Sequence, residues 1–200
     1  MSELKYTSSI KDMPLLFSEM KRTALLLCEG KTAEEILQLS NEKNIYQFEK
    51  EKRRKDVALR MIKRLSTLGK PLVEIIAHGP CYEAKLISFL ALMKSDRLIF
   101  EYMVEVYLDK ADLGYDEITD MDFLHFIDRK AQNSETVAKW TTNTLKGIRT
   151  KIKNALCEAE LAKRTKEGLL IHKPLVDEGI NGLIDEQDWI YAKAMLLLED

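Results

Sequence analysis

Apolar residues recur with the spacing of an α-helix along almost the whole chain, and this pattern limits the fold more than any other feature. Between residues 47 and 68, for example, Ala58, Met61 and Leu65 share one helical face. Only eight glycines and four prolines interrupt the 200 residues, which disfavours a loop-rich β-sandwich. A chain of this length can bury a proper core in one or two domains. The sequence therefore predicts a mainly α fold.

Capping residues, glycines and prolines mark the ends of the predicted helices. Pro14 can open a first helix that ends near Gly30. Residues 32–35, Thr-Ala-Glu-Glu, have the form of a capping box. Gly69 is expected to close the long helix 47–68. Further helices are predicted at about 71–79, 81–94, 96–110, 119–130, 142–158 and 186–198, with a short helical turn before Trp140.

The segment Leu113–Asp116 is the best candidate for a domain boundary. Beyond it, a helix, a short helix, a longer helix and a β-hairpin at 159–173 follow one another. This is the order of a winged helix-turn-helix. We therefore predict an N-terminal helical domain over residues 1–112, which contains the basic helix 47–68. The remainder, 113–200, is predicted to be a winged-helix-like domain with a small β-hairpin and a C-terminal helix.

The charges of the chain are sorted into blocks, although the net charge is only -2. Residues 50–64 hold eight basic and two acidic side chains, and residues 139–166 hold eight and two again. Between these blocks, residues 96–128 hold ten acids and two bases. Two basic blocks on a nearly neutral chain favour a polyanion-binding face, most simply one for nucleic acid. The alternative is that each block is a solvated helix face.

The first basic block falls on the helix 47–68. Arg53, Arg60 and Arg64 form a row at positions i, i+7 and i+11, and Lys63 lies on the same side, opposite the apolar face. Such a row can follow one phosphate strand, and each contact releases counterions. For this block taken alone, the alternative is a helix face that is simply exposed to solvent.

The second basic block covers the predicted recognition helix and the hairpin. A winged helix-turn-helix places the N-terminal residues of that helix nearest the bases. Asparagine can pair with adenine, threonine can meet a base edge or a thymine methyl, and lysine and arginine reach guanine or phosphate. The predicted contacts are Thr142, Asn143, Lys146, Arg149 and Lys153 on the helix and Arg164 and Lys166 at the hairpin tip. The alternative is a protein-contacting fold in which threonine and asparagine only cap the helix.

Signals for catalysis and for metal binding are weak in the sequence. Gly30-Lys31-Thr32 resembles the end of a phosphate-binding loop, but Leu25 stands where the first glycine is needed and a helix precedes it. The histidines, at 78, 125 and 172, are widely spread, and no cysteine–histidine pair has zinc spacing. We therefore expect a non-enzymatic protein with no cofactor, no metal and no small-molecule substrate.

Cysteine usage and hydropathy bear on the cellular compartment. The three cysteines, at 28, 81 and 157, are scattered and odd in number, which is not typical of a disulfide framework. Each is expected to be a buried, small hydrophobic side chain. The start of the chain lacks the apolar region of a signal peptide. No segment approaches the ~18 apolar residues of a membrane span. A cytoplasmic location is expected.

Four stretches of the chain resemble a known family. They are Leu25–Glu35 (LLL-x-EG-x-[ST]-x-EE), Arg60–Leu68 (RMIKRLSTL), Trp140–Thr144 (WTTNT) and Leu169–Val176 (LLIHKPLV). Together they resemble BrxA, the small protein of BREX bacteriophage-exclusion systems. One position departs from the usual pattern, because Glu160 stands where a glycine would follow the recognition helix before the wing.

The resemblance implies a cytoplasmic, non-enzymatic, mostly helical protein that is likened to the RNA-binding antiterminator NusB. It also implies a role in phage defence beside a methyltransferase, an ATPase and a phosphatase-like component. Binding of double-stranded DNA is the activity that it suggests.

Three functions follow from these observations. The first is sequence-lenient binding of double-stranded DNA as a non-catalytic subunit of a phage-defence system. The second is a protein adaptor, whose basic faces and acidic block 96–128 would dock partner BREX subunits. The third is RNA binding, although Tyr46, Phe48 and Trp140 are not arranged as a stacking platform for unpaired bases.

Overall fold

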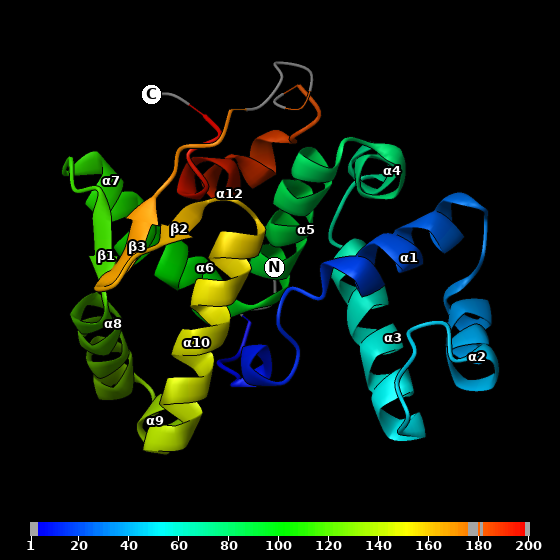
Figure 1. Cartoon of the computed structure of the whole chain (residues 1–200), viewed down its shortest axis with the longest axis horizontal. Coiled ribbons are helices and arrows are strands. Elements are labelled where there is room, and N and C mark those ends of the chain that lie inside the picture. Colours follow the sequence, from blue (N-terminus) through cyan, green and yellow to red (C-terminus); the bar gives the residue numbers. More distant parts are fainter. Residues whose placement is uncertain (1–3, 176–179, 181, 199–200) are drawn as a thin grey trace.

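The computed structural model of the chain describes residues 4–175, 180 and 182–198. It is mainly helical, with a small antiparallel sheet at one end (Figure 1). The N-terminal half comprises η1 (Ser9–Lys11), α1 (Phe17–Cys28), α2 (Ala33–Lys43), α3 (Glu51–Leu65), α4 (Lys70–His78), α5 (Cys81–Ser95), α6 (Arg97–Tyr102), η2 (Met103–Leu108) and α7 (Asp109–Asp112). The rest comprises β1 (Glu117–Thr119), α8 (Asp120–Asn133), α9 (Glu135–Ala138), α10 (Thr142–Glu158), β2 (Ala162–Arg164), β3 (Gly168–Ile171), η3 (Glu186–Asp188) and α12 (Trp189–Ala194).

Helix α5 runs through the middle of the molecule (Figure 1). It is apolar on almost every side, with Leu86, Phe89, Leu90 and Met93 among its buried residues, as expected for a helix surrounded by others. Helices α1, α3, α4, α6, α10 and α12 all contact it. The predicted boundary Leu113–Asp116 falls in the turn between α7 and β1, while one hydrophobic core contains residues from both sides of it. The two-domain division stays a prediction.

A membrane-spanning helix needs about 20 mostly apolar residues. Within the described residues, no helix combines that length with that apolar character.

Most predicted helices are confirmed, and their ends show why. Thr32 and Glu35 form the expected capping box at the start of α2. Helix α1 ends in a Schellman motif, in which Gly30 takes a φ of 83° and Lys31 donates its N–H to the carbonyl of Leu26 at 3.0 Å. The predicted helix 96–110 is continuous from α6 to α7, with a π-helical segment at η2.

Helix α3 is shorter than the predicted 47–68, and Gly69 does not close it. The helix ends at Leu65, where the hydroxyl of Ser66 donates to the carbonyl of Lys63 at 2.9 Å. The hydroxyl of Thr67 donates to the carbonyl of Arg64 at 2.7 Å, so side chains satisfy the exposed carbonyls of the last turn. Gly69 instead serves as the N-cap of α4.

The N-terminal segment 9–16 is held inside the molecule by Arg64. This side chain is only 1% exposed, and its guanidinium donates to the carbonyls of Met13 at 2.6 Å, Pro14 at 2.7 Å and Leu15 at 2.9 Å. Because these carbonyls turn towards Arg64 and Leu16 takes a left-handed φ of 54°, α1 begins at Phe17 and not at Pro14. The prediction that Arg64 contacts a phosphate is therefore wrong, because its guanidinium is buried and donates its hydrogen bonds to backbone carbonyls.

Asp96 holds the same segment nearer its start, at Ser9. Its carboxylate accepts hydrogen bonds from the hydroxyl of Ser9 at 3.1 Å and from the N–H groups of Leu98 and Ile99, which makes it the N-cap of α6. Burial raises the pKa of the Asp96 carboxyl above its usual value. Burial also lowers the pKa of the Arg64 guanidinium to about 9, which leaves it charged at neutral pH.

The predicted hairpin is confirmed, with shorter strands than 159–173 suggested. Helix α10 reaches Glu158, and Glu160 then takes a left-handed φ of 60° in the place where a glycine was expected. The N–H of Leu161 bonds back to the carbonyl of Leu156 at 2.9 Å, which completes the helix end and delays β2 to Ala162.

A third strand, β1, completes the sheet and was not predicted. The strand order is β1-β3-β2, with β3 antiparallel to both neighbours. Gly168 in β3 faces Thr119 of β1, and a Cβ at Gly168 would lie 2.0 Å from the carbonyl oxygen of Ile118. Only glycine therefore allows the two strands to approach at this point.

The predicted C-terminal helix 186–198 is shorter in the structure, where η3 and α12 end at Ala194. Asp188 anchors it through an ion pair of 2.6 Å with Lys94 of α5, and both side chains are largely buried. Residues 199–200, and residue 176 of the LLIHKPLV stretch, lie outside the described residues.

Replacing Arg64 with alanine is expected to destabilise the protein by about 3 kcal/mol or more, because three carbonyls lose charged donors inside the protein. Urea denaturation followed by circular dichroism measures the change. Lys63→Ala, at the exposed neighbouring position, is the matched control and should change stability by less than about 0.5 kcal/mol. Equal effects for the two variants would contradict the structural role of Arg64.

Candidate nucleic-acid interface

The leading end of α10 presents polar side chains that the fold does not use. Thr141 is the N-cap, because its hydroxyl oxygen accepts the N–H of Thr144 at 3.2 Å. Thr142, Asn143 and Lys146 follow it and are exposed. Capping therefore does not explain Thr142 and Asn143, and both are available to a binding partner.

The next two basic residues on α10 are already paired. Asp120, the first residue of α8, forms an ion pair of 2.9 Å with Arg149 and a second ion pair with Lys153. Arg149 and Lys153 are also partly buried. One carboxylate thus offsets part of the positive charge that the sequence assigned to this face.

The hairpin tip is fastened to its surroundings. Arg164 donates a hydrogen bond to the side-chain oxygen of Asn154 on α10, and Thr165 donates to the carboxylate of Glu117 at 2.8 Å. Lys166 is exposed in the turn between β2 and β3. The tip that carries Lys166 is therefore tied to α10 through Arg164 and to β1 through Thr165.

The base of the hairpin is equally fixed. The hydroxyl of Tyr107, on η2, lies 2.7 Å from the carbonyl oxygen of Leu161 and 3.0 Å from that of His172. Burial raises the pKa of Tyr107 far above its usual value, so the hydroxyl keeps its proton for these carbonyls. Lys85 of α5 also pairs with Glu160 at 3.0 Å.

On α3 the predicted arginine row is broken. Arg53 is partly buried, with its guanidinium 3.2 Å from the Met13 sulfur and 5.3 Å from the centre of the Phe48 ring. Arg60 is partly buried, Lys63 is exposed, and both line a shallow hollow of about 380 Å³. With Arg64 in the interior, the basic residues of α3 that are exposed are Lys52, Lys55 and Lys63, and the acid Glu51 is exposed at its start.

The N-terminal segment joins the two basic helices. Lys11 lies against Gly147 of α10, and Met13 contacts Arg53 of α3. In Figure 1, both α3 and α10 begin at the lower edge of the molecule and run upwards. Their N-termini, which carry the positive ends of the helix dipoles, thus lie on the same side.

Much of the acidic block 96–128 is used inside the molecule. Glu101 accepts hydrogen bonds from Tyr6 and Arg97 and forms an ion pair of 2.6 Å with Lys130, which also pairs with Glu105. Burial alone would raise the pKa of the Glu101 carboxyl, but these donors hold it below its usual value. Lys110 pairs with Asp122 at 3.0 Å. This pairing reduces the acidic surface available to a partner.

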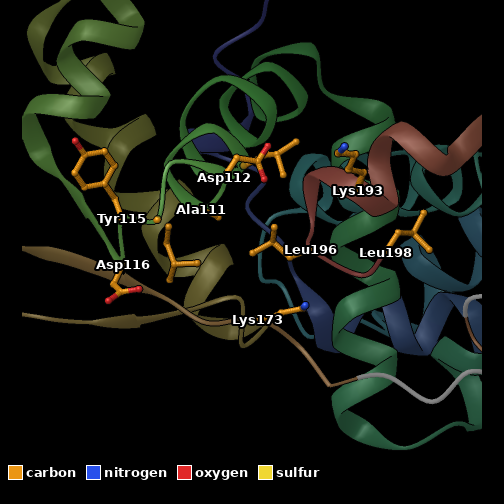
Figure 2. Close-up of a pocket in the computed structure, with 11 residues that line it drawn as sticks. Ala111, Asp112, Tyr115, Asp116, Lys173, Lys193, Leu196 and Leu198 are labelled. Atoms are coloured by element: carbon orange, nitrogen blue, oxygen red, sulfur yellow. The ribbon is translucent and has the colours of Figure 1, made fainter. Parts of the chain in front are cut away.

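An open pocket of about 420 Å³ lies between the α7–β1 turn and the C-terminal residues (Figure 2). Asp112 and Lys193 lie along one edge in this view, and Asp116 and Lys173 lie along the other. Apolar residues also line the pocket. Because two acids and two bases lie around it, the charge of the pocket favours neither anions nor cations.

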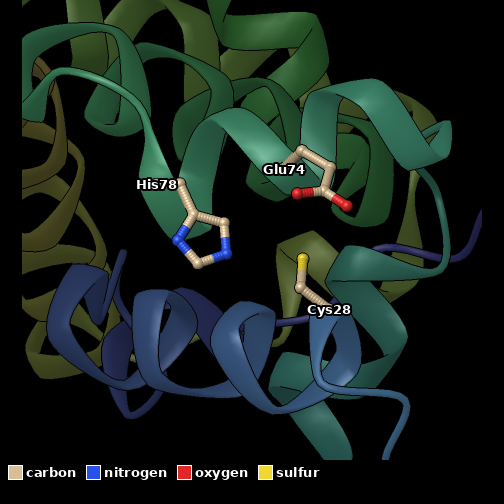
Figure 3. A group of neighbouring side chains, drawn as sticks. All are labelled: Cys28, Glu74 and His78. Atoms are coloured by element: carbon tan, nitrogen blue, oxygen red, sulfur yellow. The ribbon is translucent and has the colours of Figure 1, made fainter.

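Two helices bring together a cluster that sequence spacing did not reveal. Cys28 at the end of α1 meets Glu74 and His78 of α4, and their potential ligand atoms all lie within 4.8 Å of one another (Figure 3). Burial, and then the charge of Glu74, raise the pKa of the Cys28 thiol. The spacing of Glu74 and His78 at i, i+4 was visible in the sequence, whereas their contact with Cys28 was not.

The expectation that every cysteine is a buried small hydrophobe is wrong. Cys81 is exposed, and Cys28 and Cys157 are only partly buried.

The structure defines a mainly helical protein with a small antiparallel sheet and an exposed polar start of α10. Comparison with known proteins gives its family. A sequence model of the BrxA family matches residues 4–188. A relative from Bacillus cereus (strain H3081.97), named "BREX protein BrxA", is 37% identical over 175 residues, or 88% of each chain. The chain therefore belongs to the BrxA family, and the resemblance inferred from its motifs is confirmed.

A solved structure shares this fold. The crystal structure of an uncharacterized protein from Magnetospirillum magneticum superposes with a TM-score of 0.80 and covers 96% of this chain and 98% of its own. At 19% sequence identity, this likeness concerns the fold alone.

The two roles assigned at the start of α10 predict different effects on stability. Thr141→Ala should destabilise the protein by about 1 kcal/mol, because the helix loses its N-cap. Thr142→Ala, its neighbour, should change stability by less than about 0.5 kcal/mol. Thermal unfolding of the two variants measures the difference. A larger loss for Thr142→Ala would mean that Thr142 serves the fold and is not available for binding.

Proposed function

We propose that this protein binds double-stranded DNA as a component of a BREX phage-defence system and has no catalysis of its own. The observation that carries this proposal is the exposed set Thr142, Asn143 and Lys146 at the leading end of α10, together with the exposed Lys166 at the hairpin tip, which Arg164 ties to Asn154 further along α10. Membership of the BrxA family supports the BREX role.

The segment from β1 to β3 is proposed to act as a winged helix-turn-helix. Its order of helices and hairpin and its strand order β1-β3-β2 are compatible with that module. In this arrangement α10 enters the major groove by its N-terminus, and the hairpin tip contacts the backbone or the minor groove. Asn143 and Thr142 would meet base edges, and Lys146 would reach guanine or phosphate.

The other basic helix, α3, which carries the first basic block, would contact phosphates outside the groove. The exposed Lys52, Lys55 and Lys63 replace the arginine row in this role. Lysines bind phosphates as point charges without reading sequence, so these contacts would raise affinity for every duplex alike.

Reversing two exposed charges should weaken DNA binding and make it less dependent on salt. For Lys146→Glu combined with Lys166→Glu, we expect at least a tenfold loss of affinity for a random duplex. The slope of log K against log salt should become shallower by about 0.9 for each phosphate contact removed. Fluorescence anisotropy over a salt series measures both quantities.

The control for this double variant is Lys43→Glu, at the exposed C-terminal residue of α2. It should leave affinity within about twofold at the same salt, because a lysine releases counterions from DNA only where it lies against a phosphate. Unchanged binding by the double variant, or no binding by the unmodified protein at low salt, would overturn the proposal.

Removing the acid that pairs with α10 should have the opposite effect. Asp120→Asn frees Arg149 and Lys153 for phosphate, so affinity should rise and the salt slope should steepen. Asp128→Asn, at an exposed position of the same helix, is the matched control. A decrease in affinity for Asp120→Asn, or an equal rise for both variants, would show that the proposed face of α10 does not contact DNA.

A protein adaptor is the second candidate, and one observation favours it. Trp189 and Ile190 on α12 are 54% and 47% exposed, and an exposed tryptophan is typical of the centre of a protein interface. In Figure 1, α12 lies at the end of the molecule opposite the start of α10. Contact with another BREX subunit through α12 would therefore be compatible with DNA binding through α10.

A further inference from the structure

We propose that Cys28, Glu74 and His78 form a binding site for a zinc-like divalent metal ion. The site joins the end of α1 to α4 and does not depend on the proposed DNA-binding function. Figure 3 shows the three side chains converging from these two helices on a common point.

The backbone positions of the three residues suit a shared ligand. Glu74 and His78 stand one helical turn apart on α4, so both project from the same face. Cys28 is the last residue of α1, and the two helices pack against each other. The site thus rests on two regular elements in place of a loop, which fixes the direction of each side chain.

The separations are close to those that a metal requires. The three ligand atoms lie within 4.8 Å of one another. Metal–ligand bonds of about 2.0–2.3 Å in a tetrahedron place ligand atoms roughly 3.5 Å apart. A small rotation of the side chains is therefore enough to bring all three atoms onto one ion.

The donor set selects the kind of metal. One sulfur, one imidazole nitrogen and one carboxylate oxygen suit zinc, whereas magnesium and calcium prefer oxygen ligands throughout. A thiolate and a carboxylate carry two negative charges, which a divalent ion neutralises. Three protein ligands leave the fourth tetrahedral position open to water or to another ligand.

Lys70 is a positive charge that opposes a cation here, because its charge acts against the burial and the Glu74 carboxylate that together raise the pKa of the Cys28 thiol. Glu74 acts in the other direction on the same thiol, and burial is the largest influence of all. The bound thiolate would therefore be stabilised by the metal itself, as in other sites where metal displaces the thiol proton.

Cobalt(II) is the probe for this site, because a cobalt–thiolate bond gives a charge-transfer absorption that carboxylate and imidazole ligands do not. Titration of the metal-free chain should produce this band at a ratio of one cobalt per chain, and zinc should displace it. Cys28→Ser should abolish the band. His78→Ala should weaken cobalt and zinc binding by at least about tenfold, since even the loss of an outer-shell partner has that effect.

Matched controls separate this site from incidental binding by other side chains. Cys81→Ser removes an exposed cysteine, and His125→Ala removes an exposed histidine, both outside the cluster. Both variants should bind cobalt as the unmodified chain does. No charge-transfer band in the unmodified protein, or a band that survives Cys28→Ser, would overturn the proposal.

Thermal unfolding gives a second measurement that does not depend on the fold tolerating a change at Cys28. Zinc should raise the Tm of the unmodified protein, because a ligand that binds only the folded state stabilises it. His78 is exposed, so His78→Ala should keep the metal-free Tm while losing the increase with zinc. An equal increase in both proteins would place the zinc elsewhere and contradict the site.

Discussion

The buried guanidinium of Arg64 is the contact on which the arrangement of the two basic helices depends. It donates hydrogen bonds to the carbonyls of residues 13–15, and Asp96 accepts a hydrogen bond from Ser9, nearer the start of the chain. The segment between these anchors touches both α3 and α10. A hydrophobic residue in place of Arg64 could fill the space, but it would leave three buried carbonyls without donors. The charge of Arg64 therefore fixes the path of residues 13–15, and Arg64 is not part of a phosphate-binding row on α3.

Some of the sorted charges of the sequence become partners in the fold. Asp120, from the acidic block, joins Arg149 and Lys153 of the second basic block, and Lys130 joins Glu101 and Glu105 within the acidic block itself. Most of these pairs are partly exposed, so each contributes little to stability. Their larger effect is on the surface, because Arg149 and Lys153 share the carboxylate of Asp120, whereas Lys146 on α10 and Lys166 at the hairpin tip stay exposed.

Local features could be predicted from the sequence, and long-range ones could not. The capping box at Thr32, the helix ends around residues 30 and 158, and the hairpin all depend on neighbours in the chain. The burial of Arg64, the pairing of β1 with β3, and the meeting of Cys28 with His78 each join residues that are far apart in sequence. A helical period assigns a residue to a face, but the neighbouring segment decides whether that face is exposed. Among the candidate site residues, Lys146, Lys166 and Arg164 are exposed as predicted, whereas Arg64 is buried.

Side-chain contacts tie the hairpin to α10 and η2, which bears on how the proposed interface would bind. Glu160 turns the chain sharply after α10, Tyr107 fixes the base of the hairpin, and Arg164 ties its tip to Asn154. A duplex would therefore meet a surface whose backbone is already ordered, and binding would lose little conformational entropy. In the proposed arrangement, only Thr142, Asn143 and Lys146 stand where base edges of the major groove are read, while the lysines of α3 would contact phosphates and Lys166 the backbone or the minor groove. Three such side chains at one helix end distinguish few base pairs, which favours sequence-lenient binding over recognition of a long, defined site.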